Sequence, residues 1–497
     1  MEIELKLALH PDHHDRLRRH PILRGIHHQQ RTLHSIYFDT PEFDLFRRRI
    51  ALRLRRVDAY WIQTLKAESR SIGALTSRPE WEMTVADGQR PDFTALPAEV
   101  LDLLSDIDFN QVMPVFVTEF QRIIWLIGND HAQAEVALDI GKIQAGESHR
   151  DISEVEIELK SGAPEFLFET ARQLLRHNPL QIEPRSKAER GYILCGAMIP
   201  APTKFSRPAY DKNLPANVVW HRTMQAALVH LTANVPGFLE YAHEAEYLHQ
   251  LRVAVRRLLT GIAVGKSFGK AFIEFNQPLR QLMSSLNPAR NWDVLQHEIL
   301  PEILTALETP DDELELNEAT LDRLYHTAAR ARQQAQAMLL RPAFTQLVLD
   351  IGCDLLSAPA DDPQRTAESW ARAMLESRWQ KLLERGQNFA NLDDTQRHQI
   401  RIAAKKLRYA IDMAASIFRK KNTDPFIALL SELQDELGYV NDRVIARQLL
   451  HTLPKRTAAI GFAFGQMSGV LKYQTLHTTH SSTTVWKKLL ASKLFWR

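Results

Sequence analysis

The chain has 497 residues, 44% of them hydrophobic and 25% charged, a composition typical of globular proteins with two or more domains. Its net charge of +2 is unevenly placed, because residues 1–200 hold 25 Lys and Arg against 30 Asp and Glu, whereas residues 201–497 hold 37 against 30. This imbalance is too small for a nucleic-acid-binding tail, and two distant cysteines argue against a disulfide framework. We expect a cytoplasmic protein, since the charged start argues against a signal peptide and no apolar run reaches the roughly 18 residues of a membrane-spanning helix.

Residues 1–200 contain eight runs in which polar and apolar residues alternate, and each run predicts a β-strand. In chain order they are EIELKLAL, LHSIYFD, IALRLRRV, YWIQTLKA, PEWEMTV, VFVTEFQRIIWLI, AQAEVALDIGKI and SEVEIELK. A helix is predicted at about 164–177, after the last strand. The proline-rich segment 201–216 lacks periodicity and predicts a linker.

Residues 217–497 carry apolar side chains at every third or fourth position, which predicts an all-helical domain. Part of this region is duplicated: HQLRVAVRRLL from His249 matches HQIRIAAKKLR from His398 at an offset of 149. Each copy is followed by a second related stretch, LNPARNWDV from Leu286 and LGYVNDRV from Leu437. The sequence therefore predicts two repeats of about four helices each, at about 217–345 and 365–455, and a C-terminal tail.

Alternation places the charged residues of each predicted strand on one face. Along the chain this face carries Glu2, Glu4, Lys6, Arg53, Arg55, Lys66, Glu80, Glu82, Arg122, Glu135, Asp139, Glu154, Glu156, Glu158 and Lys160. On a single strand such a face would most often be solvated. Eight strands of the same polarity favour a sheet that closes around a charged lumen. A lumen with both signs of charge suits a multivalent anion together with a divalent metal ion.

The start of the chain resembles a known family. EIELK resembles the ExExK signature of the CYTH superfamily, the triphosphate tunnel metalloenzymes, and the match continues in order through LRLR, QTLK, PEWE, EVEIELK and RSKAERGY. The resemblance covers about residues 1–200 and implies an eight-stranded antiparallel barrel that forms a tunnel. Members hydrolyse or cyclise triphosphate substrates with Mg²⁺ or Mn²⁺.

The resemblance implies an enzyme, and hydrolysis of inorganic triphosphate (tripolyphosphate) to pyrophosphate and phosphate is the leading expectation. A lumen charged all round suits a small ionic substrate, and no apolar pocket for a base or a thiazole is evident in the sequence. Three alternatives stay open: thiamine triphosphatase activity, class IV-type adenylate cyclase activity, and a non-catalytic polyphosphate-binding scaffold.

The family motifs imply a role for individual residues. Metal ligands are expected at Glu2, Glu4, Glu156 and Glu158, with Glu154 able to replace one of them. Phosphate ligands are expected at Lys6, Arg53, Arg55, Lys66, Arg122 and Lys187. Tyr37 with Lys66 is the candidate pair for activating water, unless Tyr37 only packs at the mouth of the barrel. Four further acids are either metal ligands or ion-pair partners: Glu80, Glu82, Glu135 and Asp139.

The duplicated helices carry basic stripes at helical spacing. The first is His249, Arg252 and Arg256 with Arg257 beside it, and the second is His398, Arg401, Lys405 and Arg408 with Lys406 beside it. Single basic stripes are usually solvated, but two matched stripes can line one groove that binds an anion.

This second pattern resembles the CHAD domain, over about residues 217–455, and implies polyphosphate binding to which Arg290 and Arg443 contribute. Leu259 replaces the counterpart of Arg408, and Asn291 stands where an Asp is usual, so the first copy is expected to bind anions more weakly. For the basic, amphipathic tail, packing against a partner helix is expected ahead of contact with a membrane surface. No nucleic-acid partner is expected.

Overall fold

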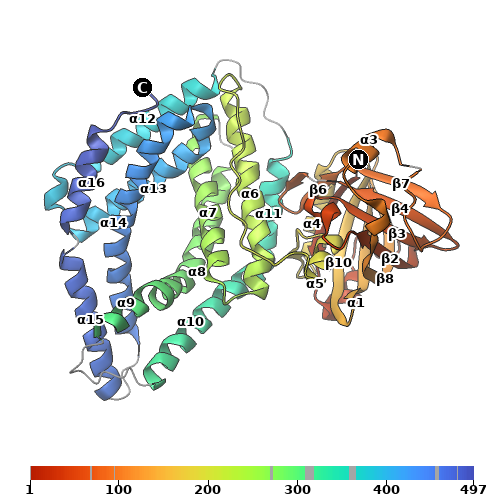
Figure 1. The fold of residues 1–497 in the computed structure, drawn as a ribbon, viewed down its shortest axis with the longest axis horizontal. Helices are drawn as coiled ribbons and strands as arrows, with labels where there is room; N and C mark the ends of the chain where they lie inside the picture. The colour runs from red at the N-terminus through yellow and green to blue at the C-terminus, as the bar shows by residue number, and fades with distance from the viewer. Residues whose placement is uncertain are drawn as a thin grey trace. The chain divides into compact units, whose positions relative to one another are not determined.

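The computed structural model describes residues 2–67, 70–94, 96–268, 272–307, 318–357, 365–453, 458–477 and 479–497. The chain forms two compact units (Figure 1). The first comprises Met1–Thr203, Leu228–Tyr241 and Leu339–Ser357, and the second comprises Lys204–Ala227, Ala242–Met338 and Ala358–Arg497. The first unit is built on an antiparallel sheet and the second is all-helical, which confirms the predicted fold class. The predicted domain boundaries at 200 and 217 stay a prediction.

Eleven strands pair in antiparallel fashion in the order β5-β6-β1-β10-β9-β8-β2-β3-β4-β7, and β11 pairs with β1. Eight of them are the predicted strands: β1 (Glu2–Ala8), β2 (His28–Asp39), β3 (Ala51–Val57), β4 (Tyr60–Lys66), β7 (Glu80–Val85), β8 (Met113–Gly128), β9 (Gln133–Ala145) and β10 (Ser148–Ser161). Three short strands were not predicted: β5 (Arg70–Ile72), β6 (Leu75–Arg78) and β11 (Gln181–Ile182). Runs of two to four residues are too short for alternation to reveal.

The register of the strands places the charged side chains on a shared face. Glu4 lies opposite Glu158, which lies opposite Glu135, and Lys6 lies opposite Glu156. Of the intervening apolar residues on the other face, Leu5 and Leu7 of β1 and Val155 and Ile157 of β10 are fully buried. The sheet curls until Lys66 of β4 pairs with Glu2 of β1, with 2.7 Å between Nζ and Oε2. It therefore surrounds a charged lumen, which we call the tunnel.

Helices cover the apolar outer face of this sheet. The first unit contains α1 (His14–Arg18), α2 (Asp44–Arg47), α3 (Ala98–Leu103), α4 (Glu165–Leu175), α5 (Lys187–Leu194) and α11 (Pro342–Asp354). The predicted helix at 164–177 is α4, which buries Leu167, Phe168 and Leu174. Helix α11 packs on α4, and Thr345 Oγ1 donates to the carbonyl of Leu180 at 2.8 Å.

One helix, α6 (Ala216–Glu240), contributes to both units, because its residues from Leu228 onward belong to the first. Leu228 lies against Gly73, whose φ of +62° is the left-handed conformation that glycine adopts without strain. Phe238 is fully buried, and Glu240 ends the helix beside Arg185. The first unit therefore includes apolar side chains from far along the sequence.

The second unit consists of helices whose order follows the predicted repeat. Its further helices are α7 (Ala245–Gly265), α8 (Asn276–Val294), α9 (Leu300–Leu307), α10 (Glu318–Leu339), α12 (Ala367–Arg385), α13 (Asp394–Ala414), α14 (Lys420–Thr452), α15 (Ala458–His477) and α16 (Thr479–Ala491). A π-helical turn, Leu295–Ile299, joins α8 to α9. Short 3₁₀ turns in the chain are Pro11–His13, Phe109–Gln111, Lys266–Phe268, Ile273–Phe275, Phe389–Asn391 and Ala415–Ile417.

The two copies of the repeated sequence meet inside this unit. Helices α7 and α13 carry the His–Gln motif, and α8 and α14 carry the second related stretch. Helix α7 packs on α8 and α13 packs on α14, while α7 also contacts α13 and α8 also contacts α14. The duplicated basic stripes therefore lie on helices that are neighbours.

The predicted linker and tail are both held by the helical unit. The linker has no helix or strand before Ala216, yet Arg207 pairs with Asp412 and the Tyr210 hydroxyl lies 2.8 Å from Thr223 Oγ1. In the tail, Trp486 stacks on Phe389 with 5.0 Å between ring centroids. The apolar side of the tail is therefore used for packing between helices. Within the described ranges, none of the helices combines the length and the apolar character needed to cross a bilayer.

Candidate active site in a charged tunnel

A cavity of about 520 Å³ lies in the tunnel, and we call it the cationic chamber. Its lining includes eight basic side chains, Lys6, Arg47, Arg49, Arg53, Arg55, Lys66, Arg122 and Lys187. It also includes four carboxylates, Glu2, Glu4, Glu156 and Glu189. The lining thus carries four more positive than negative charges, an excess that favours an anion.

A second cavity of about 730 Å³, which we call the mixed chamber, shares Glu2, Arg53, Arg55 and Arg122 with the first. Its further charged residues are Arg31, Glu80, Glu82, Glu135, Glu158 and Lys160. Its wall also includes six aliphatic side chains, Ile26, Leu33, Val57, Ile62, Ile124 and Leu126. These aliphatic side chains come from strand positions and a loop that carry no common motif, so the sequence did not reveal this part of the wall.

All six predicted phosphate ligands line the cationic chamber. Lys6, Arg53, Lys66 and Lys187 are each less than 10% exposed. Burial, together with the neighbouring Arg53 and Arg122, lowers the pKa of Arg55 to about 9. A guanidinium keeps its proton in proteins, so Arg55 stays charged. A bound anion, rather than loss of the proton, would offset the unfavourable free energy of burying that charge.

The predicted metal ligands also face the tunnel. Glu2, Glu4 and Glu156 line the cationic chamber, whereas Glu158 lines the mixed chamber. Burial raises the pKa of Glu156, but Lys187 and Arg122 outweigh it and hold that pKa well below its usual range, so the carboxylate is ionised at neutral pH. Carboxylate oxygens from adjacent strands are the ligands that Mg²⁺ or Mn²⁺ accepts. The chemistry of the β1 and β10 carboxylates therefore suits a hard divalent ion, although only Glu156 of the four belongs to a group of described acids close enough to share one.

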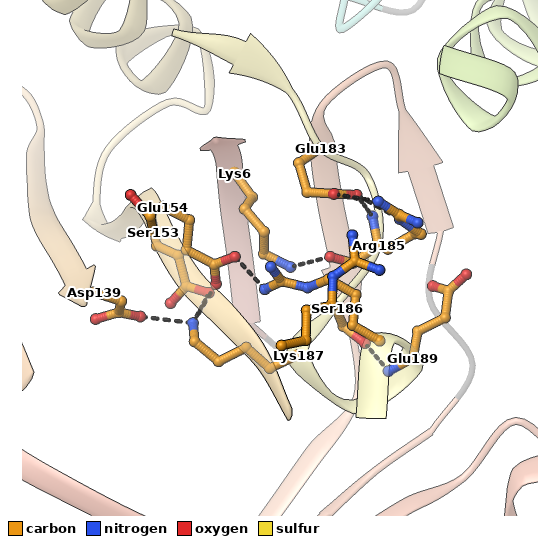
Figure 2. A network of polar contacts seen from close by, with 12 residues as sticks. Lys6, Asp139, Ser153, Glu154, Glu183, Arg185, Ser186, Lys187 and Glu189 are labelled. Atoms are coloured by element: carbon orange, nitrogen blue, oxygen red, sulfur yellow. Dashed lines mark hydrogen bonds and ion pairs between the residues drawn. The ribbon is translucent and has the colours of Figure 1, made fainter. Parts of the chain in front are cut away.

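A tighter acid cluster lies beside these ligands. Oxygens of Asp139, Glu154 and Glu156 approach within 4.8 Å of one another, a spacing that suits a metal ion. Lys187 Nζ already lies among them, 2.6 Å from Asp139, in contact with Glu154 and 2.9 Å from Glu156. Figure 2 shows its contacts with Asp139 and Glu154. Burial lowers the pKa of Lys187, but Asp139 and the two glutamates raise it above its ordinary value. The cluster therefore holds an ammonium group.

The acids of undecided role all contact cations. Asp139 also accepts two hydrogen bonds from Arg122, at 2.7 and 2.6 Å. Glu80 lies 3.0 Å from Lys66, and Glu82 lies 4.0 Å from Arg53. Glu135 pairs with Lys160, and Glu154 pairs with Arg190 as well as Lys187. This geometry favours the ion-pair alternative for these acids.

Tyr37 is packed into the wall of the cationic chamber, and its role in activating water stays a prediction. It is 3% exposed and stacks on Phe116 at 4.5 Å, and it also lines the cationic chamber. Burial raises the pKa of its phenol, but the charges of Arg53 and Arg55 outweigh burial and leave that pKa below its ordinary value. Packing therefore holds a phenol whose proton is easier to remove than usual.

Sequence reasoning missed several residues of the chamber. Arg47, Arg49 and Glu189 line it, yet they lie outside the predicted strands. Arg185 was missed too: it bonds Glu183 and Glu240, and its carbonyl accepts from Lys6 Nζ at 3.3 Å (Figure 2). The arginine run RRR at 47–49 and the motif RSKAERGY were the available signals.

The helical unit holds a cavity of about 370 Å³, which we call the helical site. Six basic side chains line it, His249, Arg256, Arg401, Lys405, Arg408 and Arg443. Four carboxylates line it as well, Glu298, Glu302, Asp435 and Asp442. Both copies of the repeat thus contribute to one site.

The other predicted residues of the basic stripes lie outside this lining. Arg252 donates to Asn287 Oδ1 at 2.9 Å, and Arg290 donates to Glu298 at 2.8 Å. Arg257 is turned toward Asp412 at 2.8 Å and lies over the Phe205 ring, and His398 contacts Asn441. Burial is the main cause that lowers the pKa of Lys406, and a different group of cations, with Arg378 first among them, lowers it further.

Like charges make the helical site electrostatically unfavourable without an anion. Burial and then Arg401 and Arg256 lower the pKa of Lys405 to about 6. Burial and then Arg290 lower the pKa of His249 to about 4. A polyanion would relieve both effects.

Comparison with known proteins agrees with this division of the chain. The CYTH domain matches residues 1–192, and the CHAD domain matches residues 222–451. An inorganic triphosphatase from Haemophilus influenzae is 35% identical over 194 residues, which cover 39% of this chain and 54% of that protein. The chain thus matches about half the length of this relative.

Solved structures add the fold of the second half. The CHAD domain from the plant Ricinus communis is 27% identical with a TM-score of 0.52, and the match covers 59% of this chain and 98% of that one. HpAC1 from Hippeastrum, described as revealing a dominant triphosphatase activity, is 21% identical with a TM-score of 0.29, over 40% of this chain and 98% of that one. That second likeness is too low to carry an argument. The chain thus carries a region that matches the CYTH domain, followed by a region that matches the CHAD domain.

Proposed function

We propose that the tunnel hydrolyses inorganic triphosphate to pyrophosphate and phosphate with Mg²⁺ or Mn²⁺, and that the helical site binds long-chain polyphosphate. The observation that carries the proposal is the cationic chamber, where six buried or half-buried cations face carboxylates of β1 and β10. The relative named inorganic triphosphatase supports hydrolysis of a triphosphate.

The residues of the chamber suit phosphoryl transfer to water. Arg53, Arg55 and Arg122 offer guanidinium groups that bind phosphate oxygens in pairs, and the buried lysines add point charges. A divalent ion held by Glu2, Glu4, Glu156 and Glu158 would offset the charge that develops on the leaving pyrophosphate. Tyr37 Oη, with its lowered pKa, is the group best suited to accept a proton from the attacking water. Ion pairs with Glu2 and Glu80 hold Lys66 in place. Its positive charge also helps to lower the pKa of Tyr37.

The test is phosphate release from tripolyphosphate by the full chain with each metal ion. We expect Glu4→Gln to lower kcat/KM by about 100-fold or more, because a ligand of the metal is lost. The same variant should bind long polyphosphate as before, since the helical site is untouched. A protein that ignored tripolyphosphate and cyclised ATP would contradict the proposal. Equal turnover by the variant would exclude a catalytic role for the β1 carboxylates.

A second candidate is hydrolysis of an organic triphosphate such as thiamine triphosphate. The aliphatic wall of the mixed chamber favours it, because an organic group can pack there while the phosphates lie in the cationic chamber. Comparing kcat/KM for tripolyphosphate and thiamine triphosphate distinguishes the two candidates. A non-catalytic scaffold predicts that neither substrate turns over while polyphosphate still binds.

A further inference from the structure

Two of the eight cations of the cationic chamber differ from the rest. Arg47 and Arg49 are exposed, whereas the other six are buried or half-buried. They belong to the end of α2 and the turn after it, between β2 and β3, rather than to a strand. The two arginines therefore lie at the rim of the chamber.

The rim segment is held rigidly. The fully buried carboxylate of Asp39 accepts hydrogen bonds from the backbone N–H groups of Thr40, Leu45 and Phe46, at 2.8, 2.9 and 3.0 Å. The Phe46 ring stacks on Tyr192 at 4.4 Å. Such a segment loses little conformational freedom when a ligand binds, which favours a preformed subsite.

Arg49 occupies this rim at a backbone cost. Its φ of +60° is the left-handed conformation, which is unfavourable for a residue with a side chain, and its N–H donates to the carbonyl of Phe46 at 2.8 Å. Strained residues of this kind cluster at ligand-binding sites. The conformation brings both Arg47 and Arg49 to the chamber, while the intervening Arg48 points elsewhere, to the carbonyl of Leu103 and to Asp106.

The chamber is also larger than a triphosphate requires. A cavity of about 520 Å³ falls in the range that encloses a drug-sized ligand, so an inorganic triphosphate leaves part of it unfilled. Asp44 lies 3.6 Å from Arg47, and such an exposed pair is weak.

We propose that Arg47 and Arg49 form a subsite for a fourth phosphate, so that the tunnel prefers linear chains of four or more phosphates to inorganic triphosphate. The proposal rests on the proposed function, because it assumes that the buried cations hold the three terminal phosphates. Two guanidinium groups on a rigid segment bind phosphate oxygens with defined geometry. The rim therefore sets the length of chain that the tunnel prefers.

The test compares kcat/KM for tetrapolyphosphate and for tripolyphosphate, measured as phosphate release by the full chain. We expect R47A/R49A to lower the ratio of tetrapolyphosphate to tripolyphosphate kcat/KM by about tenfold. R47K/R49K should recover part of the loss, because charge returns without the paired donors. R48A removes a neighbouring positive charge that does not line the chamber, and it should leave the ratio unchanged.

An equal loss of kcat/KM on both substrates would overturn the proposed subsite, since it would mean that the arginines only attract anions from solution. A ratio unchanged in R47A/R49A, or changed equally in R48A, would overturn it as well. If the unmodified protein released phosphate from neither substrate, the proposed function would fail instead. Calorimetry of tetrapolyphosphate and tripolyphosphate binding to each variant would then still test the rim. The helical site is identical in every variant, so a difference between variants would come from the tunnel.

Discussion

At the residue scale, Lys405 shows how buried like charges prepare a site for a polyanion. It faces Arg401, Arg256 and Arg252, with Asp442 as the acid opposite, and its pKa is lowered to about 6. The free side chain is therefore mostly neutral at pH 7, and if the site binds polyphosphate, as proposed, the bound polyanion would restore its charge. We expect binding to take up a proton, and the affinity for polyphosphate to fall as the pH rises from about 6 toward 9.

Calorimetry in buffers of different ionisation enthalpy measures this proton uptake directly. Lys405→Arg is the matched control, since a guanidinium stays charged across the range and should bind with less dependence on pH. If the protein and this variant showed the same pH dependence, another group would be responsible.

At the element scale, the loop before α5 is held by an ion-pair network. Arg185 bonds Glu183 and Glu240, and Arg150 bonds Glu240 as well (Figure 2 shows the Glu183–Arg185 pair). The carbonyl of Arg185 also accepts from Lys6, so the network positions a predicted phosphate ligand. Burial raises the pKa of Glu240, but hydrogen bonds from Arg185 and Arg150 outweigh burial and lower it to about 2.

We expect Glu240→Gln to lower the free energy of unfolding by about 1–2 kcal/mol at pH 7, a value reduced because the carboxylate is partly solvated. The depressed pKa means that Glu240 contributes its full stabilisation above the ordinary pKa of 4.5 and loses it as the pH falls toward about 2. Urea unfolding of the protein and the variant at pH 7, 5 and 3 checks this. A difference that stayed constant down to pH 3 would contradict it.

The elements also show what could be predicted from the sequence. The eight long strands and their charged face were predictable. Alternation of polar and apolar residues, as in β1, indicates both a strand and the face of the sheet on which each side chain lies. The pairing of Lys187 with Asp139 and Glu154 was not predictable, because it depends on where α5 lies over the sheet. Arg257 shows the same limit: helical spacing grouped it with the basic stripe, but Asp412 holds it outside the helical site.

At the scale of the whole molecule, the first unit includes two segments that lie beyond residue 203 in the sequence. Leu228 and Phe238 of α6 and Val348 of α11 are buried in it. Large apolar side chains contribute about 1.5–3 kcal/mol each when buried. We therefore expect residues 1–203 alone to unfold at a markedly lower temperature than the same unit in the full chain.

Thermal unfolding followed by circular dichroism, with tripolyphosphate turnover as a second readout, measures this loss. A chain of residues 1–357 retains all three segments of the first unit and is the matched control. Equal melting temperatures for residues 1–203 and the full chain would show that the later segments do not stabilise the sheet. The sequence could not reveal this dependence, because the linker at 201–216 suggests two independent halves.

The ammonium group of Lys187 among Asp139, Glu154 and Glu156 has a further consequence. In many small metal-binding domains, converging carboxylates or thiolates repel one another until the ion arrives, and the chain folds only with it. Here the chain supplies the neutralising charge itself, and it does so at the point where its acids converge most closely among the residues that the structure describes. We therefore expect a newly synthesised chain to complete the tunnel before it meets any metal. If the tunnel works with a divalent ion, as proposed, metal supply in the cell would decide when the protein works, and not whether it folds.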